Sequence, residues 1–64
     1  MQDNSGKRLD LGMIVSVINH SDLFDSNGWI VYEFVDVGIF THIFLKHCIT
    51  QEIRIFESKD IERG

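Results

Sequence analysis

The 64-residue sequence contains no proline, a single cysteine and no long run of apolar residues. Cys48 alone cannot form an internal disulfide, whereas small secreted domains usually depend on several, so a reducing, intracellular setting is favoured. After Asp36, the longest stretch without an acidic or basic side chain is 37–45, far below the roughly 20 residues of a membrane-spanning helix. Residues 1–12 contain no apolar segment of the signal-peptide type. We therefore expect a soluble, cytoplasmic protein.

Basic side chains are also few, because six lysines and arginines stand against ten aspartates and glutamates and give a formal net charge of -4. Proteins that bind nucleic acids generally carry a basic stripe that displaces counterions from the phosphates. The basic residues of this chain are scattered along the sequence instead. The charge balance therefore favours a protein partner.

The sequence motifs of catalysis and of cofactor binding are missing as well. The glycines are isolated from one another, so there is no Gly-rich phosphate loop. In an extended strand, His47 and Cys48 point to opposite faces, which argues against a catalytic pair and against a shared metal ion. A single domain of this length also has little room for a substrate pocket. We expect a protein that is not an enzyme and holds no metal or other cofactor.

Alternation of apolar and polar residues predicts four strands, in which β-branched and aromatic residues are concentrated. The strands cover about 11–19, 29–37, 40–47 and 52–57. Helical spacing fits the first of these and also residues 39–49, but residue propensities favour strands in both places. Ser58 is suited to cap a single helical turn at the C-terminal end.

This order of elements resembles that of small SH3-like barrels, and the resemblance of pattern covers residues 9–63. The predicted fold is mainly β: a small antiparallel, SH3-like five-stranded barrel or an open sheet, with a short C-terminal helical turn. Residues 1–8 are polar and rich in turn-forming types, so they are expected to be a flexible N-terminal arm, with a single small β domain over 9–64. The strand at 29–37 is apolar on both faces, which predicts either that it is buried on both or that it lies in a small closed barrel whose outer face meets a partner.

The predicted partner-binding site is the polar loop 19–28 together with the residue that follows it. The loop encloses Leu23 and Phe24 and ends at Asn27-Gly28, the strongest turn signal in the chain. Trp29 would join them as an exposed anchor, since tryptophan is enriched in binding hot spots. The predicted contacts are Asp22, Leu23, Phe24, Asp25 and Trp29.

Two plainer interpretations of this region stay open. The aromatic side chains Trp29, Tyr32 and Phe34 would also be suitable as core. The acidic residues Asp22, Asp25, Glu33 and Asp36 would also serve as a solvated surface that keeps a small apolar protein soluble.

The favoured function is a non-enzymatic binding module that docks on a larger protein. In its small size, lack of catalytic motifs and dense apolar content, the chain resembles accessory or inhibitor proteins encoded by phages and mobile elements. One alternative is a small nucleic-acid-binding barrel that uses a local basic edge, made of Lys46, Arg54, Lys59 and Arg63. The other is a structural homo-oligomer in which apolar strand faces pair.

Overall fold

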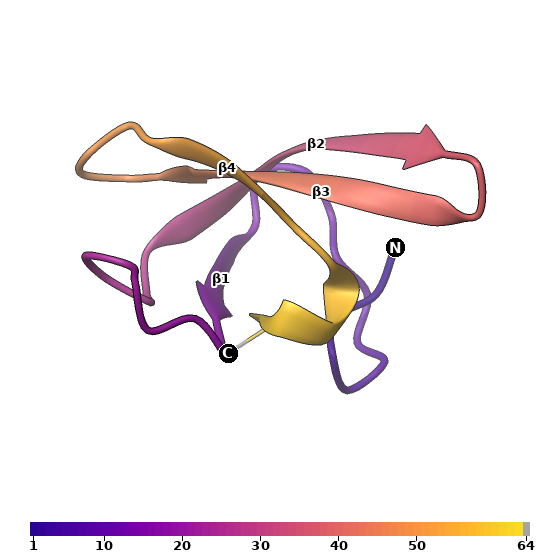
Figure 1. Cartoon of the computed structure of the whole chain (residues 1–64), viewed down its shortest axis with the longest axis horizontal. Helices are drawn as coiled ribbons and strands as arrows, with labels where there is room; N and C mark the ends of the chain where they lie inside the picture. The colour runs from indigo at the N-terminus through magenta and orange to yellow at the C-terminus, as the bar shows by residue number, and fades with distance from the viewer. Residues whose placement is uncertain (64) are drawn as a thin grey trace.

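The computed structural model describes residues 1–63, which form one antiparallel sheet of five strands (Figure 1). The strand order across the sheet is β4-β3-β2-β1-β5, and a 3-10 turn, η1, separates β4 from β5 along the chain. The elements are β1 (Ile14–Val17), β2 (Trp29–Val37), β3 (Phe40–His47), β4 (Ile53–Phe56), η1 (Ser58–Asp60) and β5 (Ile61–Glu62). The prediction of a mainly β fold is confirmed, and the sheet is open, because its edge strands β4 and β5 are not paired with each other.

The helical alternatives for residues 11–19 and 39–49 are excluded, because β1 and β3 occupy the central parts of these segments. Aromatic and β-branched residues decide both cases, as the propensities indicate. Within residues 1–63, no helix has the length and apolar character needed to cross a membrane.

The core lies on one side of the sheet, called here the inner face. Strand β3 shows the alternation most clearly, since Ile43, Leu45 and His47 are 0–1% exposed while the residues between them point to the opposite, outer face. Figure 1 shows β1 and the η1–β5 segment beneath the long β2–β3 hairpin, so these elements cover the inner face. The buried apolar side chains are Leu9, Val15, Val17, Trp29, Val31, Ile43, Leu45, Phe56 and Ile61.

A β-bulge in β2 interrupts the alternation that the sequence predicts for this strand. Val31 pairs with Leu45 and Glu33 pairs with Phe44, so Tyr32 is an extra residue without a partner of its own in β3. Trp29 and Val31 face the core before the bulge, and Phe34 packs against it after the bulge. Unbroken alternation along 29–37 would place Phe34 on the same face as Ile30, but the extra residue exchanges the two faces and turns Phe34 towards the core.

The N-terminal segment, expected to be a flexible arm, forms a hydrogen-bonded turn against the end of the chain. The backbone N–H of Leu9 donates to the carbonyl of Met1, and that of Asn4 donates to the carbonyl of Ile61. The Asp3 carboxylate is buried and accepts hydrogen bonds from the N–H groups of Ser5, Lys7 and Arg63. The turn-forming residues that suggested an arm thus close a loop around one buried carboxylate.

Gly28 completes the predicted Asn27-Gly28 turn with a positive φ of 74°. Its carbonyl accepts a hydrogen bond from the N–H of Cys48, and a Cβ at this position would lie 2.9 Å from the Cys48 Sγ. The backbone conformation therefore favours glycine, and a side chain here would also force the Cys48 side chain to shift.

Candidate interaction surfaces

The loop between β1 and β2 is held to the rest of the molecule by hydrogen bonds at its C-terminal end. The N–H of Val17 donates to the carbonyl of Ser26, and the Ser16 hydroxyl donates to Oδ1 of Asn27. The Asp25 Oδ1 accepts the N–H of Asn27 at 3.0 Å. These bonds hold the predicted binding residues 22–25 close to β1 and to the core, against which Leu23 packs.

Trp29 belongs to the core, and the prediction that it is an exposed anchor is wrong. Its side chain is 1% exposed, and its Nε1–H donates to the backbone carbonyl of Asp25 at 2.8 Å. The ring packs edge-to-face against His47 and Phe56. The plainer interpretation holds for Trp29, since an indole that satisfies its N–H inside the chain is a good core residue. It does not hold for Tyr32, which is exposed.

The other predicted contact residues have different environments. Phe24 is 83% exposed, whereas Leu23 is partly buried and packs against the core. Asp22 forms an ion pair with Arg54 across 3.1 Å. The hydrogen bond from the Arg54 guanidinium lowers the pKa of Asp22 below its ordinary value. Of the predicted apolar contacts in the loop, Phe24 alone presents its side chain to solvent.

His47 is a buried polar residue whose role the sequence did not indicate. Its Nδ1 accepts the N–H groups of Ile49 and Thr50 at 3.2 and 3.3 Å, so the ring proton of the neutral form belongs on Nε2. Nε2 lies 3.0 Å from the carbonyl of Asn27 and 3.4 Å from the Asp25 carboxylate. His47 therefore joins the β3–β4 turn to the β1–β2 loop. Within residues 1–63, no three His, Cys, Asp or Glu side chains are grouped to hold a metal ion.

The four residues of the predicted basic edge are dispersed. Lys46 lies on the outer face, with its Nζ 6.0 Å from the centre of the Tyr32 ring. Arg54 pairs with Asp22 and with Glu52, at 3.1 and 3.6 Å.

The two remaining basic residues lie near the C-terminal end of the described chain. Lys59 in η1 pairs with Glu57 at 3.5 Å, and Arg63 donates to the carbonyl of Arg8. Carboxylates thus accompany Arg54 and Lys59, and the four cations do not follow one edge of the sheet.

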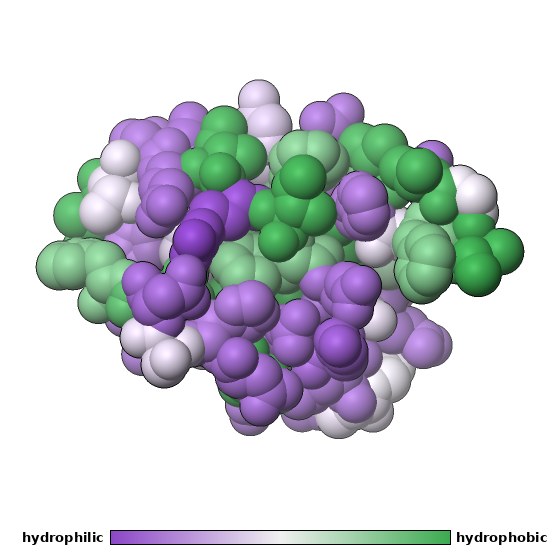
Figure 2. All heavy atoms as spheres, viewed as in Figure 1, coloured by the Kyte–Doolittle hydropathy of each residue, from purple (hydrophilic) through white to green (hydrophobic). Residues whose placement is uncertain are grey.

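A large apolar surface covers the outer face of the sheet, and we call it the apolar sheet face. It follows the strand register, in which Ile14, Ile30, Lys46 and Ile53 form one row across four strands. A second row contains Glu33, Phe44 and Ile55. The apolar residues of the whole apolar sheet face are Ile14, Ile30, Tyr32, Val35, Val37, Phe40, Phe44, Ile53 and Ile55. Figure 2 shows hydrophobic residues gathered over the upper side of the molecule, where β2 and β3 run, and hydrophilic residues over the lower side.

The apolar sheet face is large for a single small domain. Six of its side chains are between 48% and 66% exposed: Ile14, Tyr32, Val37, Phe40, Ile53 and Ile55. At roughly 150–200 Å² for a whole side chain, they leave on the order of 600 Å² in contact with water. The largest apolar patch of a typical monomer covers about 300–600 Å², and patches at this limit usually mark interaction sites.

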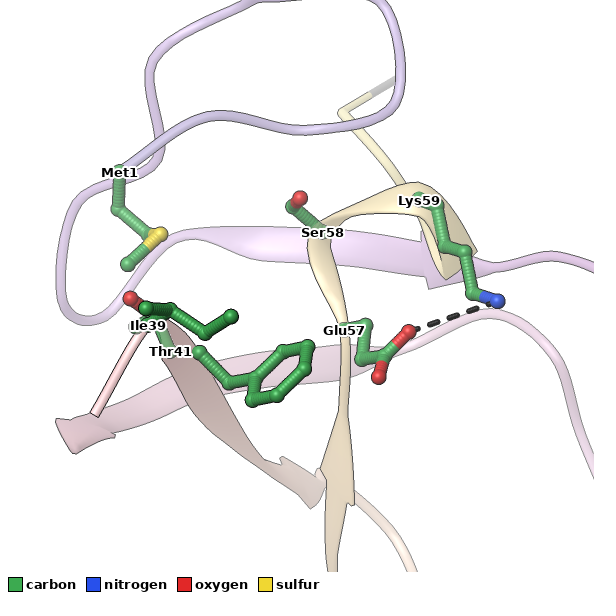
Figure 3. A pocket seen from close by; sticks show the side chains of 7 residues that line it. Met1, Ile39, Thr41, Glu57, Ser58 and Lys59 are labelled. Atoms are coloured by element: carbon green, nitrogen blue, oxygen red, sulfur yellow. Dashed lines mark ion pairs between the residues drawn. The ribbon is translucent and has the colours of Figure 1, made fainter. Parts of the chain in front are cut away.

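Two shallow grooves adjoin this surface. The first, of about 490 Å³, runs beside β4 and is lined by His20, Asp22, Phe44, Ile53, Arg54, Ile55 and Phe56. We call it the edge groove. The second, of about 340 Å³, lies at the tip of the β2–β3 hairpin and is lined by Met1, Ile39, Phe40, Thr41, Glu57, Ser58 and Lys59. Figure 3 shows its lining side chains coming from the N-terminus, the hairpin and the turn before β5, with the Glu57–Lys59 ion pair at its rim.

The sequence indicated part of this surface. The apolar character of both faces of β2 was visible, and contact of the outer face with a partner was one of the two interpretations that it allowed. The rows across β1, β3 and β4 were not visible, because they depend on the register and on the bulge at Tyr32. Comparisons of the chain with protein-family models, with curated proteins and with solved structures found no match.

Proposed function

We propose that the chain is a non-enzymatic protein-binding module that docks on a larger protein through the apolar sheet face. The observation that carries the proposal is the exposure of six large apolar side chains on one face of four neighbouring strands. Burying such a surface against a partner is favourable by about 25 cal/mol for each Å² of apolar area. Its size approaches the roughly 800 Å² that each partner contributes to an interface of standard size.

The chemistry of the face suggests the chemistry of the partner. Glu33 and Lys46 are the fully charged residues on it, and they lie in adjacent rows. The complementary surface is therefore mainly apolar, with one basic and one acidic group near its centre. The whole chain has a net charge of -4, which favours approach to a partner that is basic around this apolar patch.

We also propose that the fold is related to that of SH3-like barrels. The order β5-β1-β2-β3-β4, with a 3-10 turn between β4 and β5, resembles the arrangement of strands in SH3-like barrels. Folds of this type bind many kinds of partner, so the fold supports a binding role without selecting the partner. We propose an accessory or inhibitor protein that acts in the cytoplasm, where the exposed thiol of Cys48 stays reduced.

Direct nucleic-acid binding has less support from the arrangement of charges. Phosphate binding requires basic groups that act together along one surface. Arg54 and Lys59 each lie beside a carboxylate. Lys46 projects from the outer face of the sheet, whereas Arg54 projects from the inner side. Tyr32 lies on the apolar sheet face next to Lys46, where its ring can pack against a protein partner as well as against a nucleic-acid base.

The test is affinity capture with purified, tagged protein, followed by binding measurements with the captured protein in purified form. Ile14→Asp and Phe40→Asp place a charge on the apolar sheet face, so each is expected to weaken binding at least about tenfold. Leu11→Asp is the matched control, because Leu11 is about as exposed as Ile14 but precedes β1. Phe24→Asp tests the loop that the sequence predicted.

Three outcomes contradict the proposal. Binding that is lost with Phe24→Asp and kept with Ile14→Asp would assign the contact to the β1–β2 loop. Retention of the chain by nucleic acid at low salt, lost steeply as salt is added, would assign a nucleic-acid partner. Sedimentation as a stable dimer that Ile14→Asp dissociates would show that the face pairs with a second copy.

A further inference from the structure

Strand β4 has one open edge in the described part of the chain. It pairs with β3 alone, and its register joins Leu45 with Arg54 and Ile43 with Phe56. The N–H of His47 donates to the carbonyl of Glu52 at 2.8 Å, which fixes the phase of the hydrogen bonds along this antiparallel pair. Arg54 and Phe56 therefore exchange backbone hydrogen bonds with β3, while the N–H and C=O groups of Ile53 and Ile55 point away from the sheet.

The edge groove lies along this open side of β4. Phe44, Ile53 and Ile55 line it from the outer face, and Arg54 and Phe56 line it from the inner side. The β1–β2 loop forms the remaining wall through His20 and Asp22, since the His20 ring packs edge-to-face on Phe56 at 5.1 Å. The groove thus has an apolar side and a polar side, separated by outward-pointing backbone groups.

Carboxylates outnumber cations around the polar side of the groove: Asp22 lines it, and Glu52 and Asp60 lie beside the lining residues Arg54 and His20. Two carboxylates, those of Asp22 and Glu52, lie within 3.1 and 3.6 Å of the Arg54 guanidinium. His20 lies between two acidic groups, with its ring nitrogens 3.9 Å from Asp22 and 3.4 Å from Asp60. A basic side chain in a bound segment would be attracted to this wall, and an acidic one would be repelled.

We propose that the open edge of β4 binds an extended segment of the partner protein, which adds to the sheet as a further strand. The segment alternates apolar residues, which pack beside Ile53 and Ile55, with basic residues, which face Asp22 and Glu52. The inference rests on the proposed function, because it specifies the form in which the partner binds. Strand addition of this kind takes its affinity from backbone hydrogen bonds and its specificity from the alternating side chains.

A second copy of the chain meets a charge conflict at this edge in the register that pairs Ile53 with Ile55. Two β4 strands that pair antiparallel through Ile53 and Ile55 bring the Arg54 side chains of the two copies directly opposite each other. Like charges that face each other across a strand pair are destabilising. A segment of another protein avoids this contact when its basic side chain lies opposite Glu52, beside Asp22, and not opposite Arg54.

The experiment uses amide hydrogen exchange, measured by NMR, on the full chain with a short capped peptide in which valine and lysine alternate. In the free protein, we expect the amides of Ile53 and Ile55 to exchange fast and those of Arg54 and Phe56 to be protected by β3. Saturating peptide is expected to slow exchange at Ile53 and Ile55 about tenfold or more. The same peptide with N-methyl groups on the edge-facing amides is expected to bind at least about tenfold more weakly, and a valine–glutamate peptide to bind more weakly than the lysine peptide.

The matched variants are Ile55→Pro and Ile55→Val. Proline removes the outward N–H of residue 55, and it is tolerated on an edge strand where that N–H is not used by the sheet. We expect peptide affinity to fall about tenfold or more with Ile55→Pro and to stay within about threefold with Ile55→Val. Continued protection of the Arg54 and Phe56 amides shows that the β3–β4 pairing is intact in the proline variant.

Unchanged exchange at Ile53 and Ile55 with the lysine peptide would overturn the inference, as would equal binding of the N-methylated peptide. Protection of these amides that rises with protein concentration in the absence of peptide would also overturn it, in favour of a second copy. The two proposals can fail separately. If the captured partner is lost with Ile14→Asp but not with Ile55→Pro, the proposed function stands and strand addition is wrong.

Discussion

The inner and outer faces of the sheet contain similar residues but have opposite environments. On β3, Ile43 and Leu45 are fully buried, whereas Phe40, on the same strand, is 58% exposed. The segments that cover the inner face come from the two ends of the chain and from β1. Residues 1–63 supply one such covering layer, and it lies on the inner face. Apolar composition therefore does not decide which face is buried; the supply of covering segments does.

The sharpest test of this difference compares one isoleucine from each face. Ile43→Ala removes a fully buried side chain and is expected to lower the free energy of unfolding by about 3 kcal/mol. Ile55→Ala on the outer face is expected to lower it by less than about 1 kcal/mol. Urea denaturation measures both. If Ile43→Ala does not fold, Ile43→Val is expected to cost about 1 kcal/mol. Equal losses at the two positions would mean that the outer face is also packed.

Two histidines give a second comparison between the faces. His47→Phe keeps an aromatic ring beside Trp29 but leaves the carbonyl of Asn27 and the N–H groups of Ile49 and Thr50 without partners. The expected loss is about 2 kcal/mol of unfolding free energy. His42→Phe on the outer face is the control and is expected to change it by about 0.5 kcal/mol or less. A small effect at His47 would mean that water replaces these bonds.

The pH dependence of the free energy of unfolding tests the role of the buried Asp3 carboxylate. Burial raises the pKa of Asp3, but hydrogen bonds from Arg63, Lys7 and Ser5 outweigh it and lower the pKa from 3.8 to about 2. Because the folded pKa lies below the unfolded one, Asp3 stabilises the fold above about pH 4, and this contribution is lost as the pH falls to about 2. The stability difference between the wild type and Asp3→Asn is therefore expected to shrink over this range. Asp10→Asn, at an exposed carboxylate, is the control, and a constant difference for Asp3→Asn would contradict the assignment.

Local patterns were enough to predict the strands, whereas contacts between distant segments were not. The β-branched residues of β1, the alternation in β2 and the aromatic and β-branched content of β3 identified them as strands, and Asn27-Gly28 identified a turn. The hydrogen bond from the N–H of Arg63 to Asp3 joins residues at opposite ends of the chain, so no local pattern reports it. Residues 1–8 were predicted to be a flexible arm because the contact that holds them depends on residues far away in the sequence.

The candidate site was predicted least well, for a related reason. Phe24 was recognised as an exposed apolar residue, but Trp29 follows the same loop and is buried. The direction of the Trp29 side chain depends on its pairing with Val15 and on the carbonyl of Asp25, which receives the indole N–H. The apolar sheet face depends in the same way on four strands meeting in one register. Short-range periodicity indicates that a strand has two apolar faces, but not which of them is covered.

The neighbouring residues Ile14 and Val15 make the finest comparison, because they share a strand and differ in the face that they join. Ile14→Lys is expected to leave the free energy of unfolding within about 0.5 kcal/mol of the wild type, since the side chain meets water on the outer face. The same substitution at Val15 buries an unpaired charge and is expected to prevent folding. Circular dichroism and urea denaturation measure both effects. A loss above about 2 kcal/mol for Ile14→Lys would mean that the outer face is already covered in solution, and a protein-concentration dependence of that loss would assign the cover to a second copy.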